Sequence, residues 1–231
     1  MPGFEIIDSK ESKAVSRLFK EENGILFAHG FDNLRKKYHV RELEQNFNKK
    51  LKSKYTLVLS SGTAAIKIAL LALGVKRGDE VITQAFNFIA TVEAILDIGA
   101  IPIIANIDNS LNIDPLEIES LITKKTKAII PVHMLGVPAD MDKIILIAKK
   151  YKLKVLEDNC EALGGKYKNK YLGTIGDVGV ASLDFGKIIT CGEGGTIHTN
   201  SNKIYKFAKE YHDHGHQNNP KKTRGTDTKK I

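Results

Sequence analysis

Three short stretches of the 231-residue sequence carry side chains that could act together on a phosphorylated ligand. Ser60-Ser61-Gly62-Thr63 follows an apolar run and stands directly before a helical pattern, and Asp158 ends a second apolar run. Lys187 lies in a later stretch that contains glycines. Free amides at a helix N-terminus, flanked by hydroxyls and a glycine, form a binding site for phosphate. The sequence therefore combines, in this order, a candidate phosphate site, a strand-end acid and a loop lysine.

Each stretch also has a simpler explanation. Ser and Thr are common helix N-caps without any ligand, so Ser61 and Thr63 could only cap a helix. Asp158 could cap the next helix in the same way, and a lysine before glycines is commonly a solvated surface residue. Single residues leave these alternatives open, and the order of the three stretches is what favours a common site.

The elements that must position these residues follow from the alternation that starts near residue 55. Apolar runs predict strands over 55–59, 80–83, 101–107, 128–132 and 154–157, and helical periodicity predicts helices over 63–73, 89–98, 114–122 and 141–151. Strands that are buried on both faces and joined by helices predict an α/β domain with a mostly parallel sheet. Ligands of such sheets bind at the carboxyl ends of the strands, where the candidate residues stand.

The regions on either side of this alternation have different patterns. Two short helices near 11–20 and 41–51 make residues 1–54 an N-terminal helical segment. Shorter runs at 178–183 and 195–199 predict two antiparallel strands added to the same sheet, and a helix is expected over 202–211. We therefore predict the α/β domain over 55–211, followed by a basic polar loop over 212–231.

Composition and charge exclude several protein classes. Hydrophobic residues make up 42% of the chain and charged residues 27%, which allows a sizeable core and argues against disorder. We expect no membrane span and no secretory signal, and the two cysteines, Cys160 and Cys191, favour a reducing cytoplasm. The net charge of +8 comes with no basic stripe interleaved with aromatics, so no nucleic-acid partner is expected.

The alternating residues His212, His214 and His216 could bind a metal if they lay on one face of a strand. The surrounding sequence is polar, basic and glycine-containing, without apolar periodicity. A solvated loop is the better interpretation, and we predict no metal site.

With these residues in this order, the sequence resembles the fold-type I aminotransferases, which use pyridoxal 5'-phosphate (PLP). More narrowly, it resembles the DegT/DnrJ/StrS family of sugar aminotransferases. Essentially the whole chain takes part, through residues 61–65, 78–82, 90–94, 99–102, 126–133, 140–142, 157–158, 176–177 and 192–195. The resemblance implies the aspartate aminotransferase-like large domain, with a mostly parallel mixed sheet flanked by helices.

The resemblance also implies a role for each matched residue. Lys187 is expected to bind PLP covalently and to move a proton, and Asp158 to keep the pyridine nitrogen protonated. Phe88 is expected to stack on the ring, although it could be a plain core aromatic, and Glu161 stands near the cofactor hydroxyl, where the family often has Gln. The residues expected around the phosphate are Ser61, Gly62, Thr63 and Ser182.

Finer similarities point to one branch of the family. Residues 1–5, 182–195 and 211–216 look like 8-amino-3,8-dideoxy-manno-octulosonate transaminases, which aminate an 8-oxo sugar for lipopolysaccharide with glutamate as donor. Asn159-Cys160-Glu161 also resembles related PLP-dependent sugar 3-dehydratases, in which His replaces the lysine, so Lys187 favours transamination. The resemblance implies a homodimer for the full-length members of the family, and no membrane partner is expected.

Members of the family extend well beyond the equivalent of Ile231, with a long helix and a small C-terminal domain. We expect this chain to lack both. Two hypotheses follow: a sugar aminotransferase, or a catalytically silent domain that binds PLP or a partner chain.

Overall fold

The computed structural model describes residues 3–21, 37–213 and 215. Its centre is a seven-stranded sheet, in which β9 runs antiparallel to the other six strands. The predicted α/β class with a mostly parallel mixed sheet is confirmed. Across the sheet the strands are β1 (Tyr55–Leu59), β9 (Gly195–Thr199), β8 (Val178–Ser182), β5 (Lys154–Asp158), β4 (Thr126–Ile130), β2 (Glu80–Gln84) and β3 (Ile101–Ala105).

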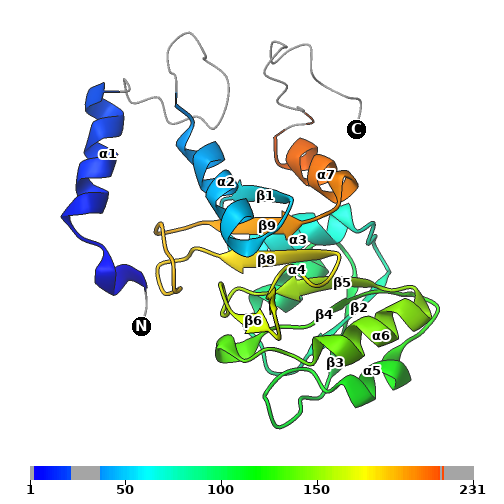
Figure 1. The fold of residues 1–231 in the computed structure, drawn as a ribbon. Coiled ribbons are helices and arrows are strands. Elements are labelled where there is room, and N and C mark those ends of the chain that lie inside the picture. The colour runs from blue at the N-terminus through cyan, green and yellow to red at the C-terminus, as the bar shows by residue number, and fades with distance from the viewer. Residues whose placement is uncertain (1–2, 22–36, 214, 216–231) are drawn as a thin grey trace.

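Helices cover both faces of the sheet (Figure 1). They are α3 (Gly62–Ala72), α4 (Ala90–Asp97) and α7 (Asn202–His212) on one face, and α5 (Pro115–Leu121) and α6 (Met141–Tyr151) on the other. One apolar core packs the first face of the sheet against side chains such as Ile66, Ile95 and Ile204 of α3, α4 and α7. A second core packs the opposite face against Ile118 of α5 and Ile144 of α6. These helices agree with the predicted ones to within a few residues.

The prediction for the last two strands is wrong in one respect. β8 and β9 pair antiparallel with each other, as predicted, but β8 runs parallel to its other neighbour, β5. The connection from β5 to β8 contains a small hairpin, β6 (Lys166–Tyr167) and β7 (Lys170–Tyr171), instead of a helix. The sequence therefore lacks the helical signal that marks a parallel crossover, and the hairpin itself was not predicted.

Before the sheet come a 3₁₀ turn, η1 (Gly3–Ile6), and two helices, α1 (Ser9–Glu21) and α2 (His39–Leu51), which match the two predicted helices. Phe47 and Leu51 of α2 pack against Leu183, which directly follows β8. Figure 1 shows α1 standing to one side of the sheet. No helix of the described ranges is long and apolar enough to cross a bilayer.

Most of the predicted basic loop, including His214 and His216, lies outside the described residues. His212 is the last residue of α7 and not part of a strand. In the described ranges no group of three or more His, Cys, Asp or Glu side chains is placed to hold a metal ion.

Glu157, in β5, is fully buried, and its side chain bonds to the connection between β5 and β8 and to His133, which follows β4. Its Oε1 accepts hydrogen bonds from the amides of Ile175 and Gly176, both at 2.6 Å, and its Oε2 from the amide of Gly173 at 2.9 Å. Oε2 also lies 3.2 Å from Nε2 of His133, whose Nδ1 accepts from the amide of Ala139. The ring proton is therefore on Nε2, which donates to the carboxylate.

We expect Glu157→Gln to lower the free energy of unfolding by roughly 3 kcal/mol. Both carboxylate oxygens accept hydrogen bonds, so either orientation of the amide turns its NH₂ group toward backbone donors. Urea unfolding measures the loss. Glu119→Gln is the matched control, because Glu119 pairs with Lys150 and Tyr151 at the surface, where water screens the interaction and its loss costs little. Equal losses in the two variants would contradict the prediction.

His198, in β9, is fully buried between two hydroxyls. Its Nδ1 lies 3.0 Å from Oγ1 of Thr56 and its Nε2 lies 2.8 Å from Oγ1 of Thr196. Because the charged imidazolium would lose its hydration there, burial lowers the pKa of His198 to about 4.

We expect the free energy of unfolding to fall as the pH is lowered from about 6.5 to about 4. In this window His198 is protonated in the unfolded chain and neutral in the folded chain, so lower pH favours unfolding, by roughly 3 kcal/mol in all. Urea unfolding at several pH values measures the slope, and His198→Gln is expected to reduce it. The same slope in both proteins would refute this assignment.

Candidate active site

A cavity of about 510 Å³ brings together every residue that the sequence predicts for the site. It lies at the carboxyl ends of β1, β5 and β8, next to the first turn of α3, where parallel sheets bind their ligands. The predicted residues that line it are Ser61, Gly62, Thr63, Phe88, Asp158, Glu161, Ser182 and Lys187.

The first turn of α3 forms one end of the cavity. Oγ of Ser61 accepts a hydrogen bond from the amide of Ala64 at 3.1 Å, so Ser61 does cap the helix, as the simpler explanation held. The amides of Gly62 and Thr63 have no acceptor among the described residues. They are thus available to an anion in the cavity.

Gly62 allows three chain segments to meet beside this turn. A Cβ at Gly62 would lie 3.0 Å from Cβ of Ser182 and 3.2 Å from Sγ of Cys160, so a larger residue would displace one of them. Burial, together with the charge of Asp158, raises the pKa of the Cys160 thiol well above its usual value. The thiol therefore stays neutral and serves to fill space.

Asp158 provides a buried negative charge in the cavity wall. The residue is only 3% exposed, and its Oδ2 accepts a hydrogen bond from the hydroxyl of Thr91 at 2.8 Å. Its Oδ1 accepts from the amide of Cys160 at 3.1 Å. Two neutral donors fix the carboxylate without neutralising it, so a cationic or N–H group of a ligand fits beside it.

Lys187 comes from the loop that joins β8 to β9. Its Nζ lies 4.0 Å from Oε1 of Glu161 and 5.8 Å from the ring centre of Phe88. Oε2 of Glu161 accepts a hydrogen bond from the amide of Leu135, so Glu161 connects the lysine to the loop after β4. Phe88 is 63% exposed, which rules out the alternative that it is a plain core aromatic.

Other residues of the cavity were not singled out from the sequence. Thr91 and Glu193 lie within the matched motifs, yet a threonine in a helix gives no sign that it donates to a distant carboxylate. Asp184 and Phe185 precede Lys187 in its loop, and only the course of that loop brings them to the cavity.

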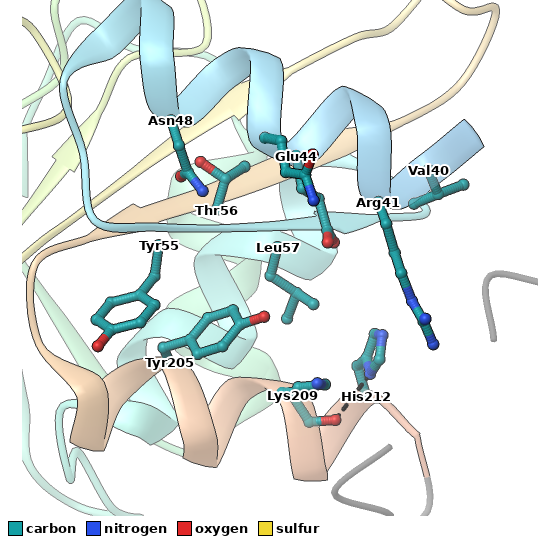
Figure 2. Close-up of a pocket in the computed structure, with 11 residues that line it drawn as sticks. Val40, Arg41, Glu44, Asn48, Tyr55, Thr56, Leu57, Tyr205, Lys209 and His212 are labelled. Atoms are coloured by element: carbon teal, nitrogen blue, oxygen red, sulfur yellow. Dashed lines mark hydrogen bonds between the residues drawn. The ribbon is translucent and has the colours of Figure 1, made fainter. Parts of the chain in front are cut away.

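A second, smaller hollow of about 230 Å³ lies between α2, β1 and α7 (Figure 2). Tyr55 and Tyr205 stack in its wall with ring centres 4.8 Å apart, and Glu44 accepts a hydrogen bond from the amide of Val58. Burial raises the pKa of Glu44. None of the residues predicted for the cofactor site lines this hollow.

Comparison with known sequences finds a family match over most of the chain. The model of the DegT/DnrJ/EryC1/StrS aminotransferase family matches residues 28–229. Among curated proteins, a GDP-perosamine synthase of Escherichia coli O157:H7 is 44% identical over 168 residues. That match covers 72% of this chain and 46% of the relative, so the chain spans less than half the length of this relative.

Solved structures agree in fold. NtdA of Bacillus subtilis, determined with bound PMP, superposes with a TM-score of 0.82 at 34% identity, covering 96% of this chain and 49% of NtdA. A GDP-4-keto-6-deoxymannose-3-dehydratase with a trapped PLP-glutamate geminal diamine superposes with a TM-score of 0.83 at 33% identity, covering 97% and 58%. The described domain therefore has the fold of the large domain of fold-type I PLP-dependent transferases.

Sequence match, fold and cavity agree with one another. The family model extends over most of the chain, and the residues predicted for the site line one cavity. The chain belongs to the DegT/DnrJ/EryC1/StrS aminotransferase family.

Proposed function

We propose that this chain binds PLP and carries the cofactor half of a sugar aminotransferase, which moves an amino group from glutamate to a keto or aldehydo sugar. The observation that carries the proposal is that Lys187 and Asp158 line one cavity together with the first turn of α3, whose amides are free. PLP, when bound, supplies a ring that withdraws electrons from the reacting carbon.

The residues at the start of α3 suit the phosphate of this cofactor. The amides of Gly62 and Thr63 would donate to phosphate oxygens, and the helix dipole adds favourable charge. Ser182 would supply a hydroxyl from β8, since its Oγ lies 3.3 Å from the Cβ position of Gly62.

Asp158 would hold a proton on the pyridine nitrogen. Its carboxylate is fixed by Thr91 and by the amide of Cys160, so it need not reorganise when the ring binds. Phe88, at the rim, would cover one face of the ring, because its side chain is exposed beside Lys187.

Lys187 would hold the cofactor through its amine and later carry a proton to and from the substrate carbon. Covalent attachment and removal of a proton from the substrate need the neutral amine, whereas return of the proton needs the ammonium form, so Nζ must alternate between the two. Glu161, at 4.0 Å, is the carboxylate next to this amine. It would stand near the cofactor hydroxyl and adds negative charge where the family often has a neutral Gln.

For the substrate, we propose 8-oxo-3,8-dideoxy-octulosonate, in the synthesis of lipopolysaccharide in the cytoplasm. The resemblance of residues 1–5, 182–195 and 211–216 to that branch supports this choice. The relative named GDP-perosamine synthase makes a nucleotide sugar the competing substrate class. Lys187 favours transamination over the dehydration named for the structural neighbour.

We also propose a homodimer, because the rim of the cavity exposes apolar side chains in two segments. Phe88 and Phe185 line the cavity, and Phe86, Ile89 and Ile188 stand close to them in the chain, each more than 40% exposed. Apolar rims of this kind are typical of surfaces that a partner covers.

Reduction with borohydride after addition of PLP is expected to fix the cofactor on Lys187. Peptide mass spectrometry locates the adduct, which Lys187→Ala abolishes. Lys154→Ala is the matched control, because Lys154 pairs with Asp177 at the surface and its loss leaves the adduct unchanged.

Asp158→Asn is expected to weaken PLP binding roughly tenfold or more, since a charge-assisted hydrogen bond is lost.

Absence of an adduct on Lys187 would overturn the proposal. An adduct without amino transfer from glutamate to any keto sugar would favour the alternative of a catalytically silent, PLP-binding or partner-binding domain. Comparison of the octulosonate aldehyde with GDP-4-keto-6-deoxymannose as acceptors separates the two substrate classes.

A further inference from the structure

Gly3 and Phe4, near the N-terminus, contact the loop that carries Lys187. The amide of Gly3 donates a hydrogen bond of 2.7 Å to the carbonyl oxygen of Lys187. The ring of Phe4 lies 5.9 Å from that of Phe185, centre to centre. Figure 1 shows η1 beside the loop between β8 and β9.

The fit at Gly3 depends on the absence of a side chain. Gly3 is buried, and a Cβ there would lie 2.7 Å from the carbonyl oxygen of Ile188 and 2.8 Å from that of Lys187. Both neighbours are backbone atoms, which a rotamer change cannot move away. Any larger residue must therefore displace either η1 or the loop.

The loop has few supports of its own at this point. The amide of Lys187 bonds back to the carbonyl of Asp184, and the next anchors are at Thr190 and Cys191, which bond to Leu183. Ile188 and Ile189, between these anchors, are each about half exposed. In the described part of the chain, the amide of Gly3 is the donor to the Lys187 carbonyl.

We propose that Gly3 and Phe4 are positioning residues for Lys187: η1 holds the lysine's backbone and so keeps its amine directed into the cavity. Gly3 fixes the carbonyl of Lys187, and Phe4 packs behind Phe185, which itself lines the cavity. The inference rests on the proposed function of Lys187, but the contact can be tested without PLP.

The experiment compares Gly3→Ala and Phe4→Ala with the parent chain, and with Glu5→Ala as a matched control on the exposed side of η1. In the PLP-free proteins, we expect amide exchange over residues 185–190 to become about tenfold faster in Gly3→Ala and to change less in Phe4→Ala. Exchange in β4 and β5 and the urea midpoint stay at parent values, because η1 contacts the loop and not the core.

The second measurement is the rate at which PLP becomes attached to Lys187, followed by absorbance. Gly3→Ala is expected to slow it severalfold, whereas Glu5→Ala leaves it unchanged. If Gly3→Ala matches Glu5→Ala in exchange, the contact does not support the loop and the inference fails. If amide exchange rises but PLP attaches at the parent rate, η1 supports the loop without positioning Lys187, and the inference fails. If the parent chain takes up no PLP, the proposed function fails, while the exchange comparison still decides whether η1 holds the loop.

Discussion

The close approach of β9 to the turn between β1 and α3 is the constraint on which the rest of the structure depends. A Cβ at Gly195 would lie 2.2 Å from the carbonyl oxygen of Ser61, so only glycine lets the two backbones meet. In this register Leu59, Gly195 and Ser182 lie side by side in three neighbouring strands. The first turn of α3, the end of β8 and the lysine loop therefore lie around one cavity.

The cavity places fixed charges of both signs within one small space. Amide dipoles of α3 line one end, the carboxylate of Asp158 one wall, and the amine of Lys187 approaches from the loop. These groups are positioned by backbone or by buried neutral partners, so little reorganisation is needed when an anionic, aromatic ligand enters. Phe88 and Phe185 lie at the exposed rim.

The sequence predicted those parts whose signals are local. Apolar runs and helical periodicity identified the strands and helices, and the order of motifs identified Ser61, Asp158 and Lys187. The direction of β8 was missed because a hairpin replaces the crossover helix. Thr91 and Gly3 were missed because their partners, Asp158 and Lys187, are distant in the chain, and neither residue type marks such a contact.

Two adjacent acids in β5 have separate duties, because successive side chains of a strand point to opposite sides. Glu157 points into the protein and binds backbone amides, whereas Asp158 lines the cavity. Glu157 therefore serves the fold, and Asp158 is left to serve the proposed cofactor site. A descendant that decayed into a non-catalytic scaffold would be free to vary at position 158 while it retained the carboxylate at 157. On the proposed role of Asp158, an acid kept at 157 without one at 158 would mark a related chain that retains the fold and has lost the chemistry.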